Sequence, residues 1–224
     1  MEDEVLEKKT EMRPDAISLL FNSTRQRILQ HLCAHPCDNL TQISRKINIS
    51  LPTAKFHLDK LGDNGYVISK QLGKKQVFYL VDMVSDDIVE ILAVLNEEMV
   101  NKIYKKIQEM PGISQKELCE TWDISHQGIS RYLKKMLDLE LIREMKTGRY
   151  VRYFTTDLLT RLEKENKARL RGFKKIILHT LKKEGLKPDL IRSTEKELVV
   201  TIKLGREVST LKLHARPFTS IFID

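Results

Sequence analysis

The sequence predicts a mainly α-helical fold with an α+β C-terminal part, and three observations lead to this fold class. The chain repeats itself after 75 residues without a gap. Each copy spaces apolar residues three and four positions apart and then alternates them, which indicates two helices followed by a strand hairpin. The last forty residues alternate throughout, as half-buried strands do. We therefore expect two helical domains, 14–98 and 99–160, followed by a helix-plus-antiparallel-sheet domain, 161–224.

The N-terminal segments are read from their polarity and capping residues. Residues 1–13 hold few apolar side chains and are expected to be a disordered tail. A short amphipathic helix should start at Asp15, and Asn22 can cap a second helix, Arg25–His35. A helical pair at 40–47 and 51–62 follows, and then a strand, Tyr66–Lys70.

The linker between the copies predicts a buried helix. Ser85-Asp86 can start it, and the helix either continues to Met110 or breaks at Asn96. Its apolar residues lie on nearly every side, so they must be covered by the flanking domains or by another subunit. These residues include Ile88, Ile91, Leu92 and Leu95.

The second copy shows the local signals most clearly. Ser114 and Glu117 form a capping box at the start of a helix, Gln115–Trp122, and Ser125 can cap the next one. The inward face of that next helix carries Ile129, Leu133, Met136 and Leu137, and its outward face carries His126, Gln127, Ser130, Arg131 and Lys134. These outward side chains can contact base edges and phosphates. Strands Leu141–Arg143 and Tyr150–Phe154 follow, joined by a cationic tip.

The first copy matches the second position by position. Asn39 and Gln42 fall on the capping pair, Ile49-Ser50 on Ile124-Ser125, and Gly73-Lys74 on Gly148-Arg149. Its outward helix face holds Leu51, Pro52, Lys55, Phe56 and Asp59, which is a poorer hydrogen-bonding set. This copy therefore either contacts DNA or packs on protein.

Both copies resemble winged helix-turn-helix domains of the ArsR/MarR-like kind, and the pair resembles the tandem winged-helix transcription regulators common in archaea. The resemblance covers residues 14–160. It implies that the second helix of each copy lies in a DNA major groove and that the hairpin, or wing, contacts the adjacent backbone or minor groove. The DNA-binding residues expected on this basis are Ser50, Pro52, Lys55, Phe56, Lys74, Lys75, His126, Gln127, Ser130, Arg131, Lys134, Lys146 and Arg149.

The C-terminal part predicts a helix, 157–184, and an antiparallel meander. Candidate strands are Asp189–Arg192, Glu197–Lys203, Glu207–His214 and Phe218–Ile223. The run from Arg161 to Lys187 is strongly basic, either as a solvated face or as a phosphate contact. Lysines and arginines outnumber acidic residues 16 to 8 in 161–224 and 11 to 8 in 99–160, whereas residues 1–98 hold 12 against 15.

Composition limits the classes of protein. The net charge of +8 and the isoelectric point near 9.3 favour a polyanionic partner. No apolar run is long enough to cross a membrane, the start is not a signal peptide, and three cysteines fit a reducing compartment, so we expect a soluble cytoplasmic protein. Motifs of phosphate loops, zinc proteases and nucleophile elbows are missing, so we expect neither an enzyme nor a bound cofactor.

One Cys/His cluster has two interpretations. His31, Cys33, His35 and Cys37 end a helix, and ArsR-like relatives include metal sensors. The favoured interpretation is helix packing without metal, since residues two apart on a helix do not face each other.

The expected function is sequence-specific binding of double-stranded DNA as a transcription regulator. We expect a homodimer that reads a two-fold-symmetric site, with the linker helix or the C-terminal sheet as the contact. The competing account is a monomer that reads a direct repeat. The alternative function is a protein-interaction scaffold within a transcription or replication assembly, and ligand or metal sensing would be an added input.

Overall fold

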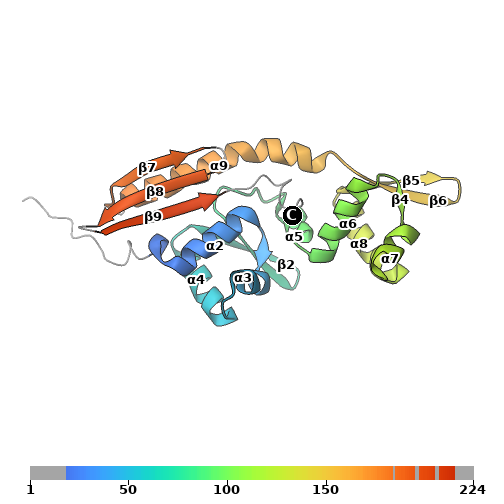
Figure 1. Cartoon of the computed structure of the whole chain (residues 1–224), viewed down its shortest axis with the longest axis horizontal. Coiled ribbons are helices and arrows are strands. Elements are labelled where there is room, and N and C mark those ends of the chain that lie inside the picture. The colour runs from blue at the N-terminus through green and yellow to red at the C-terminus, as the bar shows by residue number, and fades with distance from the viewer. Residues whose placement is uncertain (1–18, 184, 195–196, 205–206, 215–224) are drawn as a thin grey trace, which may run out of the picture.

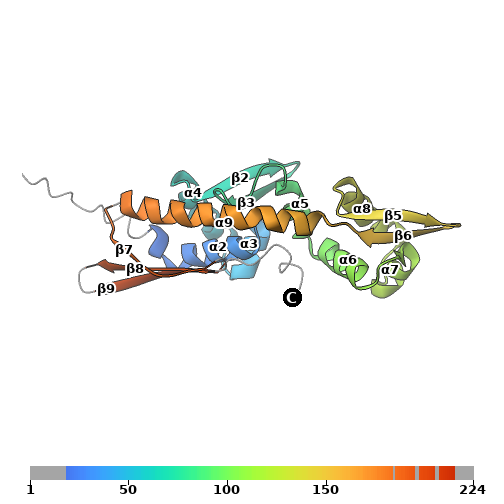
Figure 2. The ribbon, with the colours of Figure 1, turned by 90° about the horizontal axis from the view of Figure 1, so that it is seen from above.

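The computed structural model describes residues 19–183, 185–194, 197–204 and 207–214. The expected tail 1–13, most of the helix expected from Asp15, and the fourth expected strand, Phe218–Ile223, lie outside these residues. The described chain is elongated, with two groups of elements at its two ends and one long helix running between them (Figures 1 and 2). No helix among the described residues is both long and apolar enough to span a membrane.

The first group, here called the first unit, spans residues 23–80. Its three-stranded antiparallel sheet has the order β1-β3-β2, and its three helices cover that sheet. The elements are α2 (Ser23–Ala34), β1 (Asp38–Asn39), α3 (Leu40–Ile47), α4 (Leu51–Asp63), β2 (Val67–Leu72) and β3 (Lys75–Leu80).

The second unit, residues 98–155, repeats this succession, and every element boundary lies 75 residues after its counterpart. Its sheet order is β4-β6-β5. The elements are α6 (Glu98–Glu109), β4 (Ile113–Ser114), α7 (Gln115–Trp122), α8 (His126–Asp138), β5 (Ile142–Thr147) and β6 (Tyr150–Thr155). The repeat read from the sequence is therefore also a repeat of structure. The short strands β1 and β4 were not expected.

The helix starts are fixed by the expected side chains. The backbone N–H of Glu117 donates to Ser114 Oγ at 3.3 Å, and the Glu117 carboxylate accepts from the Ser114 N–H at 2.7 Å. Asn39 Oδ1 accepts from the Gln42 N–H at 3.1 Å at the equivalent place. Ser125 Oγ accepts from the Gly128 N–H at 3.2 Å and starts α8. The capping predicted from the sequence is confirmed.

Each unit buries one face of its helices against its sheet. The first unit buries Ile43, Leu58, Leu61, Tyr66 and Leu80, and the second buries Leu118, Ile129, Leu133, Met136 and Leu141. These side chains belong to one continuous apolar cluster that extends through both units. The inward faces expected from the three-and-four spacing are confirmed at these positions.

The linker between the units breaks rather than continuing as one rod. Helix α5 (Val89–Leu95) ends at Asn96, Glu97 is extended (φ −72°, ψ 119°), and α6 begins at Glu98. The helix expected from Ser85-Asp86 begins later, because Ile88 occupies the cap position and residues 85–88 form turns.

The burial of α5 corrects one expectation about its partner. Ile88, Leu92 and Leu95 are 4%, 2% and 0% exposed within the single chain, and Ile91 is half-buried. Packing inside the chain therefore satisfies the apolar circumference of this helix. A second subunit is not needed to cover it.

The C-terminal part contains the expected helix and the first three expected strands. Helix α9 (Leu158–Lys183) leads to an antiparallel sheet of order β7-β8-β9, in which the strands are β7 (Pro188–Ser193), β8 (Glu197–Leu204) and β9 (Glu207–His214). Phe173, Ile177 and Leu181 of α9 are buried in one cluster with Leu198, Val200, Leu211 and Leu213 of the sheet.

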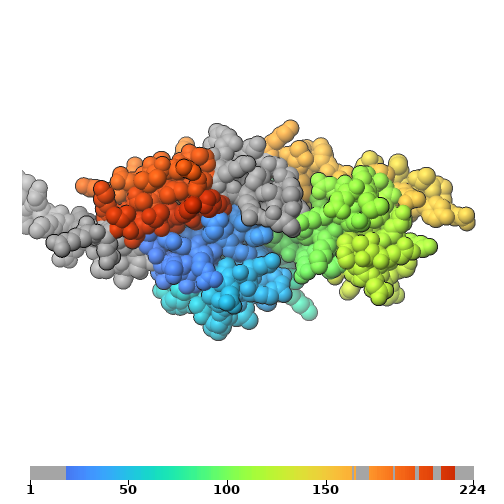
Figure 3. Space-filling model, in the orientation of Figure 1, coloured from blue at the N-terminus to red at the C-terminus, as the bar shows by residue number. Residues whose placement is uncertain are grey.

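This sheet rests on the first unit. The Gln30 side chain accepts from the His214 N–H at 2.7 Å and donates to the His214 carbonyl at 2.9 Å, as a neighbouring strand would. Gln26 donates to the Thr210 carbonyl at 3.1 Å. Helix α2 thereby covers the outer edge of β9 (Figure 1), and in the space-filling view β9 lies directly against α2 (Figure 3).

Candidate nucleic-acid interface

The outward face of α8 presents five polar side chains on a well-anchored helix. His126, Gln127, Ser130, Arg131 and Lys134 are all exposed. Gly128 permits the close approach of the preceding turn, because a Cβ there would lie 2.8 Å from Ile124 Cγ2. The α7–α8 pair is thus held tightly from behind, while its front stays open to a ligand.

Gln115, which the sequence analysis did not single out, supports this face. Its Nε2 donates to the His126 carbonyl and to Ser130 Oγ, both at 2.8 Å. These bonds tie the start of α7 to the first turn of α8 and fix the Ser130 hydroxyl. The only sequence signal for this role is position, since the first residue of one helix faces the first turn of the next.

The wing of the second unit carries cations around an exposed aromatic ring. Lys146 and Arg149 are exposed at the tip, as expected. Tyr150 is 55% exposed, and the guanidinium carbons of Arg149 and Arg152 lie 5.7 and 5.9 Å from its ring centroid. Arg152 also pairs with Glu117 at 3.1 Å, which joins the wing to the α7 cap. Tyr150 and Arg152 were missed because their roles depend on this tertiary arrangement.

The equivalent face of the first unit is more apolar. Ser50 caps α4, and Pro52 lies in its first turn. Phe56 and Leu51 are 56% and 45% exposed. Lys55 is held by Asp59 at 2.9 Å, so its charge is partly neutralised.

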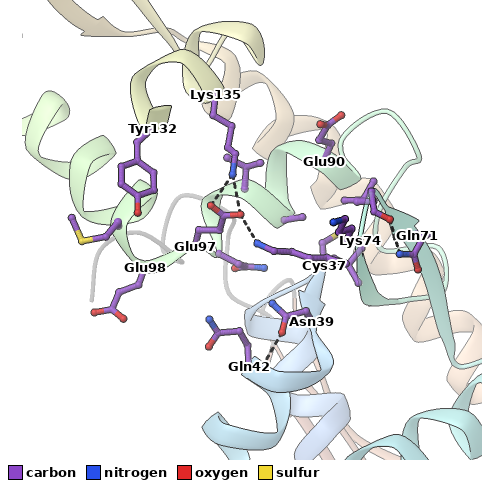
Figure 4. Close-up of a pocket in the computed structure, with 18 residues that line it drawn as sticks. Cys37, Asn39, Gln42, Gln71, Lys74, Glu90, Glu97, Glu98, Tyr132 and Lys135 are labelled. Carbon is purple, nitrogen blue, oxygen red and sulfur yellow. Dashed lines mark hydrogen bonds and ion pairs between the residues drawn. The ribbon is translucent and has the colours of Figure 1, made fainter. Parts of the chain in front are cut away.

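The wing of the first unit is partly engaged by the linker. Lys74 is exposed, but Lys75 Nζ lies 2.9 Å from Glu97 Oε1, and Lys135 Nζ of α8 lies 2.9 Å from Glu97 Oε2. Figure 4 shows both lysines converging on this carboxylate at a cleft of about 770 Å³ between the units. Lys75 is therefore directed toward the junction.

Hydrogen bonding controls the charge of Glu97. Partial burial on its own raises the pKa of the Glu97 carboxyl, but the hydrogen bonds from Lys75 and Lys135 outweigh it and hold the pKa below its ordinary value. The carboxylate is therefore ionised at neutral pH and bridges a wing of one unit to the exposed helix of the other.

The Cys/His cluster is distributed over separate interactions. His31 Nε2 pairs with Asp38 Oδ2 at 3.0 Å, and the His35 ring stacks at 5.0 Å from the His31 ring. Cys33 and Cys37 are buried; burial raises the pKa of the Cys33 thiol to about 12 and also raises the pKa of Cys37. Within the described residues, no three His, Cys, Asp or Glu side chains are grouped to hold a metal ion.

The basic run expected on the C-terminal helix is only partly visible. Arg161 pairs with Asp157 at 3.4 Å, and Lys174 is buried and donates to the Glu197 carbonyl at 3.1 Å. The side chains of 165–171 lie outside the described part of the chain. Lys174 therefore stabilises the helix–sheet contact rather than a solvated face.

Comparison with known proteins places one family match on each unit. The family described as winged helix-turn-helix DNA-binding matches residues 21–68, and the MarR family matches residues 107–149. An uncharacterized HTH-type transcriptional regulator of Methanocaldococcus jannaschii is 23% identical over 150 residues, which is 67% of this chain and 38% of that protein. The chain thus spans well under half the length of this curated relative.

Two solved structures illustrate the structural likeness. An ArsR-like transcriptional regulator from Rhodococcus sp. RHA1 is 19% identical and covers 44% of this chain and 90% of its own, with a TM-score of 0.39. The homodimeric winged helix-turn-helix DNA-binding domain Mb0332 from Mycobacterium bovis is 20% identical and covers 41% and 84%, with a TM-score of 0.27.

Proposed function

We propose, from the premise that this chain is a winged helix-turn-helix protein of the transcription-regulator type, that it binds specific double-stranded DNA sites with its two units in tandem. The observation that carries the proposal is the face of α8. It holds five exposed polar side chains on a helix whose opposite side is buried, beside a wing with two exposed cations. This arrangement suits a helix in a major groove with a wing on the adjacent backbone.

The roles of the second unit follow from its donor groups. Arg131 can give two hydrogen bonds to guanine O6 and N7, and Gln127 can pair with the N6 and N7 edge of adenine. His126 and Ser130 lie beside them on the same face, and Lys134 is placed for a phosphate. Wing residues Lys146 and Arg149, with Tyr150 between the arginines, suit the backbone or the minor groove.

The first unit supplies a second, weaker reading face in this proposal. Phe56 and Leu51 can contact thymine methyl groups, while Ser50, Pro52 and Lys55 start the helix beside them and Lys74 faces phosphate. Because Lys75 is held by Glu97, its contribution to DNA contact requires the junction to open. The second unit therefore dominates binding.

A second candidate function is supported by the same apolar side chains. An exposed phenylalanine and leucine on α4, with the nearby lysine paired to Asp59, also suit docking onto a protein of the transcription machinery. In that case the first unit is an interaction module and only the second unit reads DNA.

Assembly as a homodimer remains part of the proposal, with the contact reassigned. Residues of α5 are buried within the chain, whereas Leu190, Ile191 and Val208 of the C-terminal sheet are 50%, 64% and 61% exposed. A two-fold contact through this sheet would present two second units to a symmetric site.

Selection from a random duplex pool, followed by a genome-wide binding map of the tagged protein, tests the function. We expect one enriched motif and discrete promoter peaks. Enrichment without any motif, together with an absence of peaks, would support the scaffold function instead. A motif that survives when Phe56 and Leu51 are changed to serine would assign the first unit to protein contact.

A further inference from the structure

A second cavity lies on the first unit where the C-terminal sheet meets it. Its volume is about 740 Å³, and it is formed by α2, the end of α3 and strand β9. This size falls within the range of small-molecule sites, which is roughly 300–1,000 Å³. The lining residues are Ser23, Gln26, Arg27, Gln30, His31, Ala34, His35, Lys46, Ile47 and Lys212.

The ionisable lining residues are all basic. Arg27, Lys46 and Lys212 bring three cationic groups from three different elements, and two histidines add to them. No lining residue is acidic, although residues 1–98 hold more acidic than basic side chains. The nearest carboxylates belong to other interactions: Asp38 binds His31 at 3.0 Å, and Glu197 lies 3.8 Å from Lys212.

The cations are positioned but not consumed. The Arg27 guanidinium donates through Nη2 to the Ile47 carbonyl, which anchors one side of the group and leaves its other N–H donors. Lys46, exposed in the last turn of α3, makes no hydrogen bond or ion pair with the described residues. A cavity that concentrates cations in this way favours an anion and disfavours amines and metal ions.

We propose that this cavity binds a ligand with two or more phosphate groups, held by Arg27, Lys46 and Lys212. A planar guanidinium and two ammonium groups match phosphate oxygens, and a single phosphate is small for a cavity of this volume. The phosphates come either from a free small molecule or from adjacent phosphates of a DNA backbone.

Binding would be read by the C-terminal sheet. Gln26 and Gln30 line the cavity and also hold the edge of β9 through three hydrogen bonds. A ligand that bridges Lys46 of the first unit and Lys212 of β9 therefore favours the docked sheet. Ligand binding and docking are then thermodynamically coupled.

Calorimetric titration of the full chain with pyrophosphate tests the free-ligand source without involving DNA. We expect saturable binding that weakens roughly tenfold or more in the Lys46→Gln/Lys212→Gln variant, since two of three cations are removed. The matched control, Lys116→Gln/Lys175→Gln, removes the same charge from exposed positions that do not line the cavity. It should bind pyrophosphate as the wild type does.

The dependence of DNA affinity on salt tests the second source. If DNA phosphates occupy the cavity, pyrophosphate binds without saturation and the slope of log K against log salt falls by about 2 in the cavity variant relative to the control. Equal effects in the cavity variant and the control, in both titrations, would overturn the site. Loss of DNA binding by the wild type would refute the proposed function but leave the pyrophosphate result meaningful.

Discussion

Gln115 determines how Ser130 can act, although it lies behind the exposed face of α8. Its amide N–H occupies one lone pair of the Ser130 hydroxyl, so the hydroxyl proton is free to be donated outward. Ser130 should therefore prefer acceptors such as guanine O6, thymine O4 or phosphate oxygen.

The variant Gln115→Leu tests that preference. Leucine stands at the equivalent position, Leu40, of the first unit, so the fold should tolerate it. We expect discrimination at one base pair to fall by about 1 kcal/mol while binding to unrelated DNA is unchanged. Titration against a panel of single-base variants of the site measures this. A discrimination profile equal to that of the wild type would exclude the positioning role.

Arg131 and Gln127 carry the largest predicted share of base reading. The double variant Arg131→Ala/Gln127→Ala should lower affinity for the cognate site by about 2–4 kcal/mol, since each base contact contributes about 1–3 kcal/mol. The matched variant changes the counterparts Phe56 and Pro52 to alanine and should cost less. Similar losses in both would mean that the two units read DNA equally.

Buried thiols make a metal site at the Cys/His cluster unfavourable. A thiol ligand must be deprotonated, and burial raises the pKa of Cys33 to about 12. We expect a zinc titration to give no stoichiometric uptake and no change in DNA affinity. Tight one-to-one uptake that disappears in Cys33→Ser would contradict this expectation.

The exposed face of α8 could be predicted from the sequence, because helical spacing separates inward from outward residues without knowledge of the fold. Gln115 and Arg152 could not, because their hydrogen bonds depend on how α7, α8 and the wing pack together. Lys75 was assigned to DNA from its place at a wing. Its ion pair with Glu97 joins residues 22 positions apart and follows from the break in the linker.

The two wings, considered as elements, should contribute phosphate contacts unequally. Lys146→Ala/Arg149→Ala should reduce the salt slope of DNA binding by about 2, because each lost phosphate contact changes it by about 0.9. Lys75→Ala should change it little, since that lysine is already paired. Salt titrations with specific and unrelated DNA decide this, and an unchanged slope in the first variant would take the second wing off the DNA.

Glu97 couples the two units through one carboxylate. Glu97→Gln should lower stability by about 0.5–1 kcal/mol, the range of a partly exposed ion pair, and broaden the distance distribution between the units in solution scattering. The Glu97 pKa is depressed in the folded state, so its contribution is present at neutral pH and is lost as pH falls through that depressed value. The variant should therefore lose less stability than the wild type on acidification below the ordinary pKa of 4.5.

At the scale of the whole molecule, the sheet is the remaining candidate for self-association. Light scattering should report about twice the chain mass of 26.1 kDa for the wild type and a monomer for Ile191→Glu/Val208→Glu. Ile91→Glu, at a half-buried position of α5, is a less suitable probe because it disturbs the core. A wild-type mass near 26.1 kDa, with or without DNA, would leave a monomer that reads a direct repeat.

The repeat of the units could be predicted because it is written in local signals at a constant interval. The docking of the C-terminal sheet could not be predicted, because it joins side chains and backbone 184 residues apart. Alternation indicated strands there, but alternation contains no information about the helix that covers their edge.

The constant interval also makes the chain a reference for its own redesign. Gly65 (φ 73°) and Glu140 (φ 55°) occupy the same left-handed turn in the two units, one with glycine and one without. A non-glycine residue there costs roughly 1–2 kcal/mol, partly offset by the smaller unfolded-state entropy of glutamate. Glu140→Gly should therefore raise the melting temperature and Gly65→Glu should lower it. Each unit thus acts as a tested template for substitutions in its twin.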